Sequence, residues 1–262
     1  MANATFNQAK DYFKLVAAQS PKLKVVSSNE NRSISTASGQ DTPGDSVVVD
    51  AYGETAAPSA EYQVIAAMAA ADLPVLGKLI AAADSNLSIC GTARPVVLGS
   101  ISISTQTGSA PTLSASGQAV QVGAAQIRWY KLASLFANFA LTTRHRAQDF
   151  LGLCSIKKGT ATPDSGDYGL SSVNANFPIE FTLAQPQGEL LAYDLHGGTV
   201  TADYTMNWYS GTAPVVALAD GAPSNAVITN PFGKSDPENG YTQYTWQVSI
   251  PLIGSDTDPD AT

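Results

Sequence analysis

The stretch PVVLGSISISTQTGSAPTLSASGQ, residues 95–118, predicts the architecture of this chain. Isoleucine and serine alternate over residues 100–104, and a two-residue alternation is typical of a β-strand. The alternation returns in the segment that begins at Pro111, and TQTGSAP between the two runs contains the Gly and Pro of a turn. The stretch therefore predicts two strands that are joined by a turn.

Further short runs with strand character lie on both sides of this stretch. KLKVV and SVVVDAYG precede it, whereas FPIEFTLAQ, GELLAYDL, TVTADYTMNWYS and TQYTWQVSIPL follow Gly159. Turn signals such as DSGDYG, HGG, DGAPSN and DPENG separate the later runs. Regularly spaced short strands favour a mainly β, antiparallel sandwich or barrel.

Helical patterns predict one to three helices beside the strands. Residues 4–18 place apolar side chains at three- and four-residue steps and predict an N-terminal helix. The alanine-rich segment 59–72 begins at a potential N-cap serine, and RHRAQDFLG, residues 144–152, follows a potential N-cap threonine. The polar segment 27–46 contains Gly and Pro and predicts a long loop that is mobile in the isolated subunit.

The composition limits the classes of partner. Only 14% of the residues are charged, against roughly 25% in an average soluble domain, so polarity comes mainly from uncharged groups. Such groups are cheaper to desolvate than ions, which suits extensive contact between proteins. The net charge of −8 argues against a general nucleic-acid binder. The longest apolar run, residues 64–71, is too short to span a bilayer, so no membrane partner is expected.

The positive charge of the chain is concentrated in LTTRHRAQDFLGLCSIKKGT, residues 141–160. After residue 160 the chain has one basic residue, Lys234, against twelve Asp and Glu. This change of charge near Gly159 suggests a sub-boundary within a single domain that spans residues 1–262. The cluster is either a subunit interface that contacts a neighbour's acidic surface or a solvated charged face, and the sequence favours neither. Its four cations are Arg144, Arg146, Lys157 and Lys158.

The motifs that could carry catalysis are incomplete. FGKSD contains the end of a phosphate-binding loop signature, but the first glycine of that signature is replaced by Ile228, so a turn is predicted. Cys154 and His145 stand nine residues apart, which is not a known catalytic spacing, and Cys154 is predicted to be a buried thiol. A disulfide bond between Cys154 and Cys90 is an alternative that the sequence leaves open.

The remaining candidates also favour structural roles. His196 precedes two glycines and predicts a hairpin turn, while DSGD at 164–167 predicts a turn and DTDPD at 256–260 a solvated tail. The Trp-Tyr pairs at 129–130 and 208–209, together with Trp246, lie in strand patterns and predict core or subunit-contact positions. The chain is therefore expected not to be an enzyme and to use no cofactor or metal.

The order of segments resembles virion structural proteins of tailed bacteriophages, of the tail-tube type. The resemblance covers residues 47–207, and it is carried by VVLGSISISTQTGSAPTLSASGQ, RHRAQDFLGLCSI, GDYGLSSVNANFPIEF and LLAYDLHGGTVTADYTMNW. It implies a β-sandwich or barrel subunit whose hexameric rings stack into a tube that conducts DNA without specific binding. It also implies self-association, contacts with other virion proteins, assembly in the host cytoplasm and a final location in the virion.

Three alternatives to the tail tube stay open at this point. A capsid decoration or other head protein is close to it, and a non-viral adhesion or carbohydrate-binding β module belongs to another class. The third alternative is an enzyme of unknown type. In a tube, a bore lined by Asp, Glu, Ser, Thr and Asn would repel phosphate, and Arg144, Arg146, Lys157 and Lys158 are expected to point away from it.

Overall fold

The computed structural model confirms that the chain is mainly β. A 12-stranded sheet dominates, and apart from the short parallel pair β9–β15 its strands are antiparallel. The described residues are 22–40, 46–73, 75–77, 79–80, 88–89, 92–93, 95–121, 130–135, 138–141, 150–181, 190–191 and 195–254. The expected N-terminal helix at 4–18 lies outside these residues.

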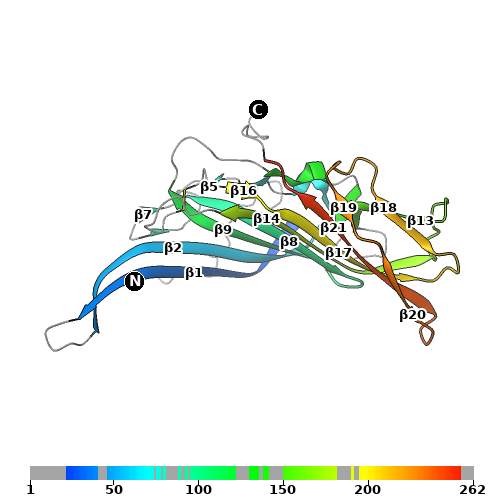
Figure 1. The fold of residues 1–262 in the computed structure, drawn as a ribbon, viewed down its shortest axis with the longest axis horizontal. Helices are drawn as coiled ribbons and strands as arrows, with labels where there is room; N and C mark the ends of the chain where they lie inside the picture. The colour runs from blue at the N-terminus through cyan, green and yellow to red at the C-terminus, as the bar shows by residue number, and fades with distance from the viewer. Residues whose placement is uncertain are drawn as a thin grey trace.

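Eight strands follow one another across the sheet, and four short strands pair beside them (Figure 1). The order of the described strands has two ends, so the sheet is open and does not close into a barrel. The order is β1 (Leu23–Gln40), β2 (Ser46–Val64), β9 (Thr112–Gln121), β8 (Val96–Gln106), β14 (Tyr168–Phe181), β17 (Thr199–Trp208), β21 (Tyr241–Pro251) and β19 (Val227–Ile228). The four additional strands are β5 (Leu79–Ile80), β15 (Leu190–Leu191), β16 (Leu195–Gly197) and β20 (Phe232–Asp236).

The quoted stretch forms β8 and β9, as its alternation predicts. The two strands pair antiparallel, and Gly108 in the turn between them has a φ of 84°, a conformation that glycine adopts at little cost. Ile101 and Ile103 are buried, whereas Ser102 between them is partly exposed. The period of two therefore assigns one side of each strand to the core and the other to solvent.

The core lies against one face of the sheet. Phe177 on β14 is the cross-strand neighbour of Ile101, and Tyr204 on β17 stacks on Trp246 of β21 with 5.1 Å between ring centroids. Short elements cover this core face and bury Leu76, Leu132, Leu141, Leu153 and Cys154 in the same cluster. These elements are β3 (Met68–Ala69), β4 (Val75–Leu76), β10 (Tyr130–Lys131), β11 (Asn138–Leu141), β12 (Phe150–Gly152), β13 (Cys154–Lys158), β18 (Pro214–Leu218), and the 3₁₀ turns η3 (Ala70–Asp72) and η4 (Leu132–Leu135), with β6 (Ser88–Ile89) and β7 (Thr92–Ala93) as a separate pair.

The polar segment 27–46 differs from the loop predicted for it. Residues 27–40 belong to β1, which pairs with β2 along its length, and β2 begins at Ser46. The two strands form a long ribbon that extends beyond the other strands (Figure 1). Ladder hydrogen bonds need no apolar side chains, so a ribbon that is exposed on both sides lacks the alternation by which half-buried strands are recognised. The tip, residues 41–45, lies outside the described residues.

The helix predicted over 59–72 is wrong. Strand β2 runs to Val64, and β3 and η3 follow in place of a helix. Tyr62 and Val64 are buried while Gln63 between them is partly exposed, which is the period of a strand. The helix propensity of alanine is a fraction of a kcal/mol per residue, so pairing with β9 on one side and β1 on the other overrides it.

Two further predictions are settled only in part. Of the helix predicted over 144–152, residues 144–149 lie outside the described part of the chain, and its last residues form β12. The sheet continues across the suggested sub-boundary at Gly159, because β8 before it pairs with β14 after it over residues 100–106 and 172–178.

An ion pair joins the start of β1 to η3 and gives the fold a pH dependence. The Asp72 carboxylate accepts hydrogen bonds from Lys22 Nζ at 2.6 Å and from the Ala69 backbone N–H at 2.7 Å. Burial by itself raises the pKa of Asp72, but these hydrogen bonds outweigh it and the net pKa is lowered.

We expect Asp72→Asn to lower the unfolding free energy at neutral pH by about 1 kcal/mol or less, because the pair is partly exposed. A carboxylate with a lowered folded-state pKa stabilises the fold above its unfolded pKa, and the effect is lost as pH falls through the folded pKa. Urea midpoints of the parent and the variant should therefore converge in acid. The exposed substitution Asp220→Asn is the control, and a gap between Asp72→Asn and the parent that persists in acid would contradict the assignment.

Candidate functional surface: the polar face of the sheet

The side of the sheet opposite the core is a continuous polar face. The pairing register places the side chains of six neighbouring strands, from β2 to β21, in two parallel rows. The first row consists of Glu61, Ser114, Ser102, Asn176, Thr201 and Ser249. The second row consists of Gln63, Thr112, Ser104, Asn174, Asp203 and Gln247. We refer to these twelve residues as the polar face.

Hydrogen bonds between neighbouring strands hold this face in place. Ser104 Oγ donates to Asn174 Oδ1 at 2.7 Å, and Gln247 Nε2 donates to Asp203 Oδ1 at 2.8 Å. Next to the first row, the hydroxyl oxygens of Ser100 and Ser116 lie 2.5 Å apart. Short polar side chains thus satisfy one another across the ladder, and they leave a surface of hydroxyl and amide groups.

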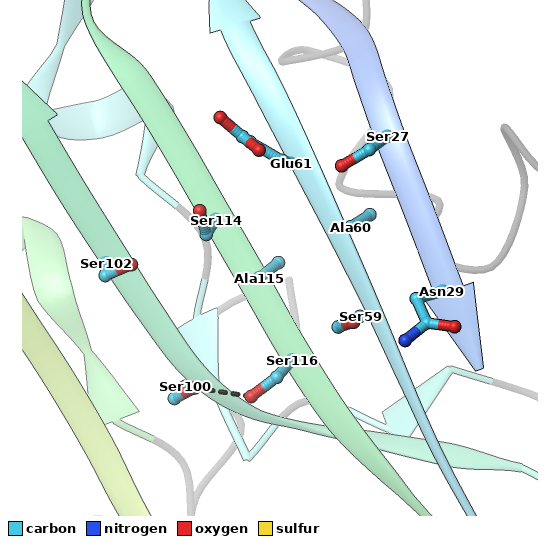
Figure 2. A pocket seen from close by; sticks show the side chains of 10 residues that line it. All are labelled: Ser27, Asn29, Ser59, Ala60, Glu61, Ser100, Ser102, Ser114, Ala115 and Ser116. Carbon is cyan, nitrogen blue, oxygen red and sulfur yellow. Dashed lines mark hydrogen bonds between the residues drawn. The ribbon is translucent and has the colours of Figure 1, made fainter. Parts of the chain in front are cut away.

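The polar side of the sheet contains a shallow depression. A depression of about 370 Å³ lies over β1, β2, β9 and β8, and Ser27, Ser102, Ser114 and Glu61 are among its lining residues. Figure 2 shows these side chains spread along four strands and not directed at one point. Binding pockets for small molecules usually combine apolar walls with a few convergent polar groups. The depression lacks that arrangement, so the face suits contact with something large.

The charges of the polar face are few and negative. Glu61 and Asp203 are its acidic members, and neither row contains a Lys or Arg. The lysines next to these rows stand on the outer strands of the sheet, where Lys24 of β1 pairs with Gln63 and Lys234 of β20 pairs with Gln243. Binding of a nucleic-acid backbone depends on cations that neutralise phosphates, so the middle of this face is unsuited to hold DNA.

The predicted interface residues are brought together only in part. Arg144 and Arg146 lie outside the described residues. Lys157 and Lys158 belong to β13, whose alternate residue Ile156 is buried in the core, so the exposed Lys157 faces away from the polar face. Lys158 Nζ donates to Asp167 Oδ1 at 2.9 Å, and this hydrogen bond is the first cause of the lowered pKa of Asp167. An acid of the same subunit thus already neutralises Lys158.

The turn predicted at 164–167 is confirmed, because the Asp167 backbone N–H donates to the Asp164 carbonyl. The prediction of a turn at Gly233 is wrong, since residues 232–236 form β20 and pair with β21. A Cβ at Gly233 would lie 2.6 Å from the ring of Tyr244, so packing against that ring requires the glycine. The GKS sequence is therefore explained by strand packing and not by phosphate binding.

The buried position predicted for Cys154 is confirmed. Burial raises the pKa of the Cys154 thiol to about 12. A thiol with this pKa is protonated at neutral pH and is a poor nucleophile. Cys90 and His145 lie outside the described residues, as does the predicted acidic tail at 256–260.

The tryptophans in the described strands belong to the core, as predicted. Trp208 and Trp246 are buried, and the Trp208 Nε1–H donates to the Thr212 carbonyl at 2.7 Å. Trp129 lies outside the described residues. The hairpin turn predicted at His196 is wrong, because His196 is in β16 and pairs with Glu180 of β14. The exposed aromatic residue of the 208–209 pair is Tyr209, which lies edge-on to Tyr241.

The sequence analysis singled out none of the polar-face residues, although part of the signal was present. Serine at every second position of β8 and β9, and asparagine at 174 and 176, mark strand sides that avoid apolar contact. The pairing register between distant strands, which joins these positions into rows, is a property of the tertiary structure and not of any one segment.

The described chain is thus an open antiparallel β-sheet protein with one core face and one polar face. No family model matches the sequence, and no curated protein matches it either. Within the described residues, no helix combines the length and apolar character needed to span a bilayer, and no three metal-binding side chains form a group.

Proposed function

We propose that this chain is a self-assembling virion structural subunit of the tail-tube type. Copies join edge to edge into hexameric rings, the rings stack, and the polar face lines a bore through which DNA passes. The short elements over the core face make the subunit a two-layer sandwich whose second layer lies outside the bore. The ring number comes from the resemblance to tail-tube proteins, and the other virion proteins meet this tube at its ends.

The two-row polar face is the observation that carries this proposal. Enzymes and small-ligand binders need convergent groups in a cavity, whereas this face presents short neutral side chains over six strands. Two carboxylates per subunit would give six subunits a negative bore that repels phosphate, and the absence of cations from both rows leaves DNA no attachment points between the edge lysines Lys24 and Lys234. A conduit needs this combination of polarity and weak binding.

The two edges of the sheet support assembly. Among the described strands, β1 pairs on one side only, and so do β19 and β20, which leaves ladder groups available at both edges. Exposed apolar side chains accompany each edge: Val26 is 55% exposed at one edge, and Val227 and Phe232 are 62% and 70% exposed at the other. Different surfaces at the two edges suit a head-to-tail contact between subunits. Such contacts close into a ring when the rotation from one subunit to the next is a whole fraction of a full turn.

Electron microscopy of the purified chain tests the proposal directly. We expect hollow rings or tubes in negative stain and a matching large species in size-exclusion chromatography. A monomer or a trimer under all assembly conditions would count against the tube and favour a decoration or adhesion role.

The orientation of the polar face is tested by adding a cation to it. We expect tubes of Asn174→Lys to retain short duplex DNA that is protected from nuclease, because a lysine in the bore neutralises phosphate charge. Each neutralised phosphate makes the slope of log K against log salt concentration more negative by about 0.9. Val215→Lys, on the exposed outer ribbon β13–β18, is the matched control and should bind only DNA that nuclease digests. If both variants bound DNA only in a nuclease-sensitive form, the polar face would not line a bore.

A further inference from the structure

The turn between β20 and β21 contains a chemically labile pair of residues. Asn239-Gly240 is the one Asn-Gly pair in the sequence. Both residues are exposed, Gly240 has a φ of 69°, and a Cβ built on Gly240 would meet nothing within 4 Å. Gly240 therefore has no side chain that could hinder attack by its backbone nitrogen, and the space that a side chain would occupy is open.

From this arrangement we propose that Asn239 is a site of spontaneous deamidation, a modification that proceeds through a cyclic imide formed with Gly240. The Gly240 backbone nitrogen attacks the Asn239 side-chain carbonyl carbon, and a new C–N bond closes a five-membered ring. The side-chain nitrogen leaves as ammonia and carries away the proton lost by the Gly240 nitrogen. Water then opens the imide at either carbonyl, which gives aspartate or isoaspartate, and no oxidant or reductant takes part.

The conversion changes a contact that organises the turn. Asn239 Nδ2 donates to Asp236 Oδ2 at 3.0 Å, and the Asn239 backbone N–H donates to Asp236 Oδ1 at 3.2 Å. The side-chain hydrogen bond is the first cause of the lowered pKa of Asp236. After deamidation a carboxylate replaces this donor and faces the carboxylate of Asp236, so an attraction becomes a repulsion. Isoaspartate also adds a carbon atom to the backbone of the turn.

The turn fixes how β20 pairs with β21, so the modification acts on an edge of the sheet. Asp236 and Tyr241 form the pair next to the turn, and Phe232 at the other end of β20 pairs with Thr245. Turn length and geometry set the register of a hairpin, and a lengthened turn loosens the pairs beside it. We therefore expect β20 to become less protected as the protein ages, whatever the assembly state of the subunit.

The test is to incubate the intact protein at mildly alkaline pH and analyse its peptides by mass spectrometry and by enzymatic methylation of isoaspartate. We expect conversion at Asn239 to exceed that at Asn230 by more than an order of magnitude. Asn230 is also exposed, but it is followed by Pro231, whose backbone nitrogen has no proton to lose. An Asn239 that stays intact while the excised peptide converts would overturn the proposal.

A second measurement follows the structural effect. The variant Asn239→Asp imitates one product, and Asn239→Gln keeps an amide while disfavouring the five-membered ring. We expect faster amide hydrogen exchange in β20 for Asn239→Asp than for Asn239→Gln, with the exchange of β8 equal in both. Equal exchange in β20 would show that deamidation leaves the edge unchanged and would overturn that part of the proposal.

Discussion

Replacement of Phe177 by alanine is expected to lower the unfolding free energy by about 3–5 kcal/mol, the usual cost of removing a large aromatic side chain from a core. Phe177 is 0% exposed and is among the largest fully buried side chains of the described chain. It stands on β14 opposite Ile101 of β8, in the middle of the sheet. A cavity there faces Ile101, which the regular pairing of β14 with β8 holds in place, so little collapse can compensate for it.

The matched control is Phe232→Ala, in which the same side chain is removed from the edge strand β20. Phe232 is exposed, so we expect its loss to change the unfolding free energy by about 0.5 kcal/mol or less. Urea unfolding of both variants, followed by tryptophan fluorescence, gives the comparison. For self-association we expect the reverse order: Phe232→Ala should weaken it more than Phe177→Ala does. Equal losses of stability in the two variants would mean that the assignment of core and edge is wrong.

The strands of the core were predictable from the sequence because burial leaves a local record. Ile101 and Ile103 must face one way and their serine neighbours the other, so a window of a few residues already shows the period. The turn at Gly108 leaves a similar record, since few residues other than glycine tolerate its backbone conformation. Both features depend on neighbours in the chain and not on distant contacts.

The β1–β2 ribbon and the end of β2 could not be predicted in the same way. Residues 35–40 are polar or small on both sides, which is also the composition of a loop. At Ala60 the alanine-rich sequence favours a helix, but β9 and β1 supply partners on both sides and a strand results. Pairing with another segment decides both cases, and the residues of one strand alone do not show that partner.

The candidate surface was out of reach for a related reason. The features that stand out in the sequence are clusters of charge, and the clearest of them contains Arg144, Arg146, Lys157 and Lys158. The polar face is instead built from unremarkable serines and asparagines whose common direction depends on register. Reactive side chains can be recognised by residue type alone. A surface of neutral polar side chains can be recognised only after the strands have been placed side by side.

Shortening the β1–β2 ribbon is expected to weaken tube formation strongly while the subunit still folds. In the variant, residues 34–54 are replaced by a two-residue Asn-Gly turn, which suits a tight hairpin. The pairing of β2 with β9 involves residues 59–63 and is left intact, as are the buried positions Tyr62 and Val64. The urea midpoint should therefore change little, because the removed part contributes no residue to the described core cluster.

The effect on assembly should be large because the ribbon is too long to serve the subunit alone. A two-stranded ribbon is marginally stable in water and gains most from packing against another surface. Ile34, at an irregularity of β1, is half-exposed on this ribbon and would be buried by such a contact. In the proposed tube, a stacked ring would supply this surface, and each subunit would contribute one ribbon to the next ring.

We expect the concentration needed for assembly to rise at least tenfold in the shortened subunit, which corresponds to a loss of about 1.4 kcal/mol or more per contact. Sedimentation over a concentration series, with negative-stain images of each pellet, measures this rise. The point variant Ile34→Asp keeps the length of the ribbon but opposes its burial, so it should weaken assembly in the same direction with unchanged thermal stability. If the shortened subunit formed tubes at the parent's concentration, contacts along the tube would have to come from the sheet edges and the short-strand layer. The ribbon would then need another partner to explain its length.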